Sequence, residues 1–425
     1  MRRYQLNPKV SVSIVFVAAM FMSIMDGTIV NVALPSLGRQ LNIPSTSIDA
    51  VVIAYMISLA IVIPVSGWLG DRWGTRRVFL IALALFTIAS ALCGLAGDFA
   101  MLVIFRFLQG AAGGALTPVG TTMLYRTFPP AERVQISSVL IIPTVIAPAT
   151  GPLLGGLLVD QLSWRWVFYV NVPIGIAVLL FGLLFLQEHR EPAPGHFDLI
   201  GFLLAGIGLA LALFALSSSP TRGWNSPIVL FSASAGLLLL VAFVVVELRK
   251  REPLLDLRLL NNRLFRSINV VSLFSSAAFL GVLFIAPLFL QEGRGVNALT
   301  SGLTTFTEAL GVVTSTQIVA LLYPRIGPRR LMVGGLTGVA ILMALLSLIG
   351  ADTSLWLMRL LMFLVGAGMA YSFLPSQTAA FATISSADTG RASSLYNAQR
   401  QLGSAVGVAV LSSVLSAVGT TQLSA

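Results

Sequence analysis

Apolar runs of about 20 residues recur along the whole chain, and this recurrence limits the fold more than any other feature. Each run is long enough to cross a bilayer as a helix, and the short alternating pattern of a membrane β-barrel is absent. Only 10% of the 425 residues are charged, against about 25% in soluble domains, which excludes a soluble globular protein. We expect an all-α polytopic membrane protein. About thirteen spans are expected, at residues 11–34, 49–70, 78–97, 100–124, 136–159, 166–186, 198–217, 227–247, 267–290, 299–322, 331–350, 355–378 and 393–417.

The basic residues predict the orientation of these spans. With the N-terminus in the cytoplasm, most of the 26 Lys and Arg residues fall on the cytoplasmic side, as the positive-inside rule requires. The net charge of +10 is therefore explained by topology, and a nucleic-acid partner is not expected because no basic recognition helix is present. The outer loops hold only Arg39, Arg165, Arg222 and Arg294.

Two parts of the chain repeat each other. Arg106 and Arg359 each lie one or two turns before a glycine cluster, in the fourth and twelfth spans. The loops 67–77 and 323–330 also match, since both combine glycine with paired arginines. Spans one to four therefore recur as spans nine to twelve, which is a common plan of secondary transporters. The expected domains are residues 1–190 (N-terminal six-helix half), 191–262 (inserted helix pair and cytoplasmic loop) and 263–425 (C-terminal half).

Several kinds of sequence motif are absent, and this limits the functions that the chain can have. An odd number of spans puts the C-terminus outside, so either a final helix is missing from this sequence or one span is misassigned. No GxxxxGK[ST] loop and no long soluble segment is present, so energy must come from a gradient or a partner. The single cysteine, Cys93, excludes an intramolecular disulfide. His189 and His196 share an inner loop, and no nucleophile–base set stands out, so we expect no enzyme, cofactor or metal site.

Motifs in chain order resemble those of the major facilitator superfamily, and within it the proton-linked multidrug exporters of the fourteen-span EmrB/QacA type. The resemblance implies two pseudo-symmetric helical halves around a central cavity, plus two inserted helices. The chain departs from the group at Ala50, where tryptophan is common, and in lacking a fourteenth span, so the last helix is expected to be missing. The matching motifs are Asp26–Pro35, Gly67–Arg77, Leu102–Gly110, Ala147–Gly156, Ser163–Gly175 and Phe197–Gly201.

Charged residues inside the spans are the candidates for proton coupling. Asp26 lies near the middle of its span, where an acid costs about 3 kcal/mol by insertion scales, so we expect it to face the cavity and bind a proton. The alternative is permanent pairing with an arginine. The resemblance implies a coupling role for Arg106, whose alternative is a packing strut bonded to carbonyls. Glu308, about 13 Å deep, is a second proton site or a docking charge, or else it lies at a wet cavity wall.

Two further sets of residues are expected to gate the transporter and to line its cavity. Glycines permit tight turns and close helix contact, and prolines kink a span. By resemblance, the residues between spans two and three hold one side of the transporter shut. The residues of span five control leak and antiport direction. Ordinary close packing of helices is the alternative for both sets. Lining aromatics could stack on flat cations, or pack elsewhere. The gating residues are Gly67, Asp71, Arg72, Gly74, Arg76, Pro148, Gly151 and Pro152. The cavity residues are Asn31, Tyr55, Gln109, Phe306, Tyr371, Asn397 and Arg400.

The resemblance implies a proton-coupled multidrug efflux antiporter in the cytoplasmic membrane, which would confer antibiotic resistance. Its expected partners are a cationic or neutral amphiphile, protons and the lipid bilayer, and a periplasmic adaptor is left open. One alternative is a dedicated exporter of one physiological compound, such as a lipid, amino acid or siderophore. Another is a non-transporting sensor or scaffold, in which Asp26→Asn would leave function intact.

Overall fold

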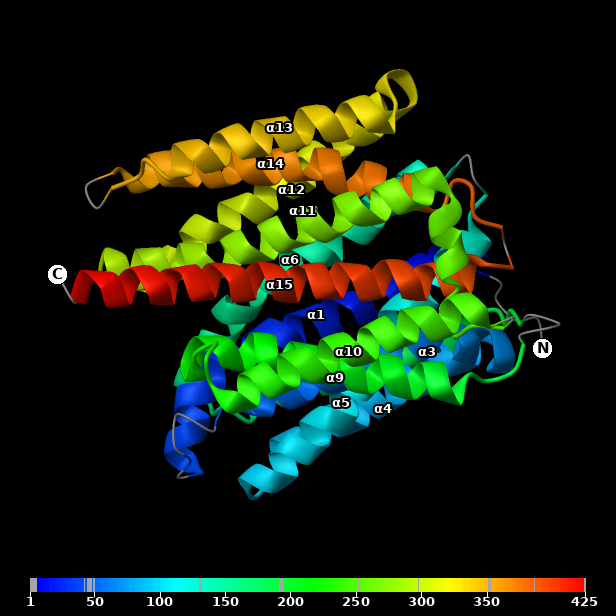
Figure 1. Ribbon diagram of the computed structural model, residues 1–425, viewed down its shortest axis with the longest axis horizontal. Helices are drawn as coiled ribbons and strands as arrows, with labels where there is room; N and C mark the ends of the chain where they lie inside the picture. Colours follow the sequence, from blue (N-terminus) through cyan, green and yellow to red (C-terminus); the bar gives the residue numbers. More distant parts are fainter. Residues whose placement is uncertain are drawn as a thin grey trace.

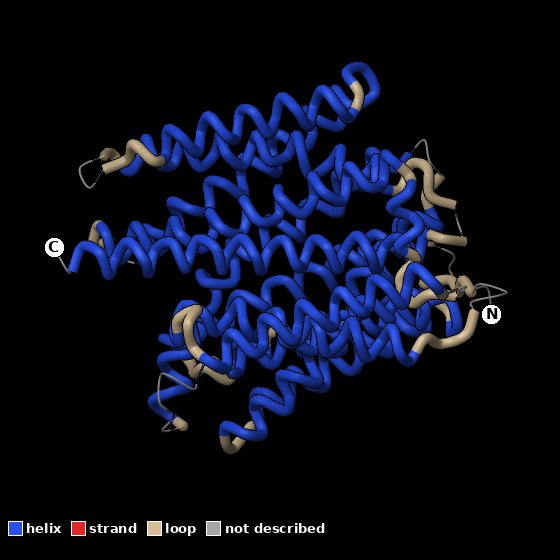
Figure 2. Tube along the Cα trace, viewed as in Figure 1, coloured by secondary structure: helices blue, strands red, loops and turns tan. Residues whose placement is uncertain are grey.

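The computed structural model describes residues 6–41, 43, 48, 50–129, 132–190, 195–250, 252–296, 298–350, 353–385 and 387–423. The described backbone is helical, with loops at both ends of the bundle and no strand (Figure 2). The all-α fold expected from the apolar runs is confirmed. The helices are α1 (Pro8–Gln40), α3 (Ala50–Trp73), α4 (Thr75–Leu95), α5 (Phe99–Thr127), α6 (Arg133–Gln161), α7 (Trp166–Tyr169), α8 (Asn171–Phe185), α9 (Leu199–Arg222), α10 (Pro227–Arg249), α11 (Arg263–Leu288), α12 (Ala298–Ile326), α13 (Pro328–Leu346), α14 (Leu355–Ala380) and α15 (Thr389–Leu423).

The outer surface of the bundle is apolar over much of its area. Within the described residues, eleven helices are long and apolar enough to cross a membrane. On α10, Phe231 and Leu238 are 69% and 70% exposed, and many other large apolar side chains are exposed in the same way. Soluble proteins rarely expose such continuous apolar surface. The outer faces of these helices are therefore suited to contact lipid.

Local sequence signals set the helix ends. Asn7 caps α1 by accepting a hydrogen bond from the Lys9 amide at 3.0 Å, and Pro8 occupies the first turn, where its missing N–H costs nothing. The turns before α4 and α13 both use glycine in the left-handed region, Gly74 at φ 97° and Gly327 at φ 80°. The two loops that match in sequence therefore also match in backbone conformation.

Helix pairing repeats between the two parts of the chain. In the first part α1 packs on α6, and α5 packs on both α3 and α4. In the second part α11 packs on α15, and α14 packs on both α12 and α13. Figure 1 shows α11–α14 in the upper part of the view and α1 and α3–α5 in the lower part, with α15 between them. The inserted helices α9 and α10 pair with each other, and α9 packs on α3 and α15.

Several hydrogen bonds between the two parts lie near the end of the bundle that holds the N-terminus. The Gly67 amide of α3 donates to Ser394 Oγ of α15 at 3.0 Å. Tyr125 of α5 donates to the Gln377 carbonyl of α14 at 3.1 Å. Ser393 of α15 also donates to a carbonyl oxygen of α5, at 2.9 Å. Figure 1 places the N-terminus at this end and the C-terminus at the opposite end.

Candidate functional site

A closed network of polar side chains surrounds Asp26 in the interior of the first part. Arg106 Nη1 lies 2.5 Å from Asp26 Oδ2, and Gln109 Nε2 donates to Asp26 Oδ1 at 2.9 Å. Asn171, the first residue of α8, donates to the same Oδ1 at 2.8 Å. All four side chains are fully buried. Both carboxylate oxygens therefore have charged or amide donors, which offset the cost of burying the charge.

The spacing of residues on α5 explains how this network forms. Arg106 and Gln109 are three residues apart, so both project from one face of the helix toward α1. The guanidinium also donates from Nη1 to Gln109 Oε1 at 2.8 Å and from Nε to the Val51 carbonyl at 3.3 Å. Asn171 had no role assigned from the sequence. The feature that could have identified it is a single amide side chain at the start of a strongly apolar span.

Tyr55 separates this network from the central cavity. Its ring lies 4.2 Å from Arg106 Cζ, and its hydroxyl donates to the Ser23 carbonyl at 3.2 Å. Tyr55 lines the cavity, whereas Asp26 does not. The expectation that Asp26 faces the cavity is therefore not met in this conformation, because α5 supplies donors that hold the carboxylate on the far side of the tyrosine ring.

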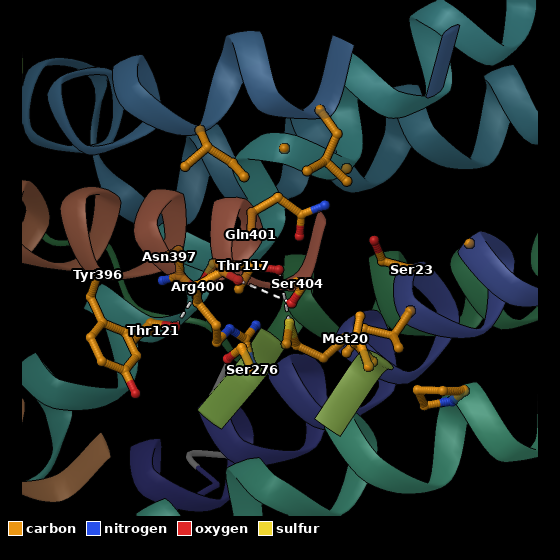
Figure 3. Close-up of a pocket in the computed structure, with 18 of the residues that line it drawn as sticks. Met20, Ser23, Thr117, Thr121, Ser276, Tyr396, Asn397, Arg400, Gln401 and Ser404 are labelled. Carbon is orange, nitrogen blue, oxygen red and sulfur yellow. Dashed lines mark hydrogen bonds between the residues drawn. The ribbon is translucent and has the colours of Figure 1, made fainter. Parts of the chain in front are cut away.

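The central cavity has a volume of about 250 Å³ and is built from both parts of the chain. Of the residues expected in it, Tyr55, Asn397 and Arg400 line its wall, and so does Pro148. Among the lining residues that the structure describes, Arg400 is the one charged side chain, and none is Asp or Glu. Figure 3 shows Tyr396, Asn397 and Arg400 close together on α15, with Ser276 beside Arg400. Polar side chains from α5, α11, α14 and α15 complete this wall: Thr117, Thr121, Ser272, Ser276, Gln377, Gln401 and Ser404.

Four residues expected in the cavity lie elsewhere in this conformation. Gln109 is fully buried in the Asp26 network, and Asn31 is exposed on α1. Phe306 and Tyr371 pack against the apolar cluster around Val312 between α12 and α14. Helical periodicity alone does not determine which polar or aromatic side chain reaches a cavity, because the rotation of each helix is set by its neighbours. A cavity role for these four residues stays a prediction.

Glu308 is a buried acid without a partner. Its side chain on α12 is 1% exposed, and neither carboxyl oxygen has a hydrogen-bond partner in the described structure. It does not line the cavity. The neighbouring helix α14 approaches closely because Gly366 has no side chain; a Cβ there would collide with the Glu308 carbonyl. The acid is thus enclosed by tight helix packing.

Comparisons with known proteins identify the family. Residues 16–408 match the family model described as Major Facilitator Superfamily. The chain belongs to the major facilitator superfamily. It is 34% identical, over 94% of its length and 75% of the relative's, to "Multidrug resistance protein B homolog" of Mycobacterium tuberculosis. It is 32% identical, over 94% of its length and 74% of the relative's, to "Multidrug transporter protein MdtP" of Bacillus subtilis.

A solved structure supports the fold assignment. The crystal structure of the human organic anion transporter MFSD10 (TETRAN) superimposes with a TM-score of 0.68 and 19% sequence identity. The match covers 97% of this chain and 95% of that one. At this identity the likeness shows the fold alone. Together, the family and its relatives establish a membrane transporter rather than an enzyme.

The expected gating loop of this major facilitator protein lies where its two parts meet. Asp71 accepts a hydrogen bond from Arg126 at 3.0 Å, and both side chains are almost fully buried. Gly390, in the first turn of α15, lies against the Asp71 carboxylate, where a Cβ would be 2.9 Å from Oδ2. The positive end of a helix dipole stabilises a carboxylate there. Gly67 lies against the same helix at Ser394. The loop thus joins α3 to both α5 and α15.

The other predicted gating residues are spread over the neighbouring contacts. Arg76 donates to the Leu183 carbonyl at 2.6 Å, whereas Arg72 is exposed. On α6, Gly151 lies directly against Thr28 of α1, where a Cβ would collide. Pro152 falls in α6, and its side chain lies outside the described residues. The close α1–α6 contact explains the small residues of this motif by packing, and a role in leak or antiport direction stays a prediction.

Proposed function

We propose that this superfamily member is a proton-coupled multidrug efflux antiporter of the fourteen-span EmrB/QacA type. It would export amphipathic organic compounds across the cytoplasmic membrane, with its N-terminus in the cytoplasm, and so contribute to antibiotic resistance. The multidrug names of the relatives support the activity. The inserted pair α9–α10 supports the subgroup. The bias of basic residues toward one set of loops supports the orientation.

Proton coupling is supported above all by Glu308. A carboxylate buried without any donor is far less stable than the neutral acid, so Glu308 holds a proton in this conformation. A conformation that brings water to α12 would let the proton leave. Such a change of protonation between two conformations is what a gradient needs in order to drive transport.

Asp26 and Arg106 supply a second proton-dependent element. In this conformation the pair is closed and has further donors from Gln109 and Asn171. A proton on Asp26 would remove the counter-charge of Arg106 and leave a cation in the protein interior, which is strongly unfavourable. Protonation would therefore favour rearrangement of α1 against α5. Because Tyr55 lies between the pair and the cavity, this movement would shift a side chain that a bound substrate contacts.

The exported compound would reach the cavity by a rocking movement of the two halves, 1–190 and 263–425. The contacts of Gly67 with Ser394 and of Tyr125 with Gln377 would close the cytoplasmic side in the conformation described. Opening that side would require these hydrogen bonds to break. Hydrogen bonds of this kind can break and form again as the two halves move against each other.

Transport into proteoliposomes under an imposed pH gradient tests the proposal. A suitable probe is (naphthalen-1-ylmethyl)trimethylammonium or naphthalen-1-ylmethanesulfonate, because both stay charged at every pH and cross bare lipid slowly. Protein-free liposomes correct for leak. Glu308→Gln and Asp26→Asn should each lower gradient-driven uptake of the transported probe by about tenfold or more. Uptake that survives both substitutions unchanged would contradict proton coupling.

A further inference from the structure

The charge of the central cavity is positive. Among the described residues that line its wall, Arg400 is present and no acidic side chain is found. Two acids buried in the spans lie elsewhere: Asp26 is enclosed with Arg106 behind Tyr55, and Glu308 is enclosed between α12 and α14. A cationic substrate entering the cavity would therefore meet a like charge and no counter-charge.

Arg400 has no acidic partner within the part of the chain that the structure describes. None of the ion pairs found among the described residues includes it. It lies eleven residues after Thr389, where α15 begins, which is about 16 Å along the helix at 1.5 Å per residue. An arginine at such depth normally pairs with an anion or faces a water-filled cavity. The guanidinium is thus a cation available to a ligand in this cavity.

Polar side chains surround Arg400, and large apolar side chains line other parts of the same cavity. Asn397 and Gln401 lie beside it on α15, and Ser272 and Ser276 lie on α11. Figure 3 shows Asn397, Gln401 and Ser276 around Arg400, with Ser23 of α1 farther away. These side chains offer several neutral donors near one cation. Large apolar side chains line other parts of the wall: Phe16, Met20, Ile24, Leu59, Phe279 and Phe373.

We propose that this cavity selects amphipathic compounds that carry an anionic group, a carboxylate or sulfonate, and that Arg400 binds this group. The inference rests on the proposed transport function and specifies its substrate class. The planar guanidinium offers paired N–H donors that match two oxygens of a carboxylate or sulfonate. The apolar body of the compound would lie against α1, α3 and the phenylalanines of α11 and α14. Of the cationic or neutral amphiphile expected from the sequence, the cationic kind is less compatible with this wall.

Binding to the purified full chain in lipid nanodiscs tests the charge preference without any gradient. Three probes share one ring system: naphthalen-1-ylmethanesulfonate, (naphthalen-1-ylmethyl)trimethylammonium and the neutral N-methyl-1-naphthylacetamide. We expect the sulfonate to bind about tenfold or more tightly than the ammonium compound, with the amide between them. Empty nanodiscs correct for partition into lipid. Ammonium binding equal to or tighter than sulfonate binding, or no sulfonate binding, would overturn the proposal.

Substitutions of two arginines assign the preference to one side chain. Arg400→Gln should weaken sulfonate binding by about tenfold or more and leave the amide unaffected, and Arg400→Lys should keep part of the preference. Arg359→Gln is the matched control, because Arg359 lies in a span of the same half but does not line the cavity. Sulfonate affinity that is unchanged in Arg400→Gln would overturn the assignment.

The two proposals fail in different experiments. If the sulfonate preference is present in nanodiscs but gradient-driven uptake is unaffected by Asp26→Asn and Glu308→Gln, proton coupling is wrong and the cavity assignment stands. If uptake depends on those acids but the probes bind without charge preference, the cavity assignment is wrong and coupling stands. The three probes are compared in the unsubstituted protein, so this test does not depend on whether any variant folds.

Discussion

The two halves of the molecule share a helix arrangement but hold their buried acids in opposite ways. In the N-terminal half, Asp26 is bound by Arg106 and by two amides. In the C-terminal half, neither oxygen of Glu308 has a partner in the described structure. The repeated arginine differs likewise, since Arg359 donates to Thr304 Oγ1 at 3.3 Å instead of to an acid. A shared helix arrangement therefore supports one buried ion network in the N-terminal half and one buried acid without a described donor in the C-terminal half.

The largest effect should come from breaking the ion pair of the N-terminal half. Arg106→Met leaves Asp26 with amide donors alone and should destabilise the fold by about 3–5 kcal/mol, because a buried charge loses its partner. Thermal unfolding of the purified protein in detergent measures the change. The double variant Asp26→Asn/Arg106→Met should recover much of the loss, since neither charge remains. A double variant as unstable as the sum of the single ones would contradict a coupled pair.

The amide at the start of α8 should matter less than the arginine. Asn171→Ala removes donors to Asp26 at 2.8 Å and to Ser90 at 3.0 Å and should cost about 2 kcal/mol, the usual value for a hydrogen bond to a charged group. Asn269→Ala is the matched control in the other half. Its amide is equally buried but donates to the neutral Phe265 carbonyl, so the loss should be about 1 kcal/mol. Equal losses in unfolding experiments would show that the charge of Asp26 adds nothing.

The acid of the C-terminal half should behave in the opposite way. Glu308→Gln should change the free energy of unfolding by less than about 1 kcal/mol, because a neutral acid is replaced by a neutral amide of similar shape. Gradient-driven transport should fall in the same variant. A destabilisation as large as that of Arg106→Met would mean that Glu308 is ionised and has a charged partner, which would remove the contrast between the halves.

The smallest effect is expected at a solvent-exposed acid, which serves as a reference for the two buried acids Asp26 and Glu308. Glu252, next to the inserted pair, accepts hydrogen bonds from the His196 amide at 2.8 Å and from its ring at 3.0 Å, and these lower the pKa of its carboxyl. A lowered pKa means that the contact stabilises the protein above the usual carboxyl range and is lost as pH falls through the lowered value. His196→Ala should raise the pKa of Glu252, and NMR of the protein with labelled glutamate measures this pKa. A pKa that does not move would show that the backbone amide alone is responsible.

Much of the fold could be read from the sequence because bilayer-spanning helices impose a simple pattern. The expected spans 100–124 and 355–378 correspond to α5 (Phe99–Thr127) and α14 (Leu355–Ala380). The main difference is at 166–186, which forms the short α7 and then α8. The repeat was visible in its glycines and arginines, and Gly74 and Gly327 adopt the same left-handed conformation. These features depend on local composition and backbone geometry.

The candidate site was only partly accessible from the sequence. Hydropathy singled out Asp26, Arg106 and Glu308, because charged residues in apolar spans are rare. It did not distinguish the paired acid from the unpaired one, and it gave Asn171 no role. Contacts between helices far apart in the chain decide these points, since α5 and α8 bring donors to α1 whereas α14 brings none to Glu308.

By itself, the sequence determined a helical membrane transporter fold, its spans and its internal repeat, because the cost of exposing backbone groups to lipid leaves few alternatives. Only the tertiary structure decided which charges meet. It placed Asp26 behind Tyr55 and left Arg400 as the one charge among the described residues of the cavity wall. The physical reason is that helix rotation and helix contact, which set the partners of each side chain, depend on packing among all the spans rather than on any one of them.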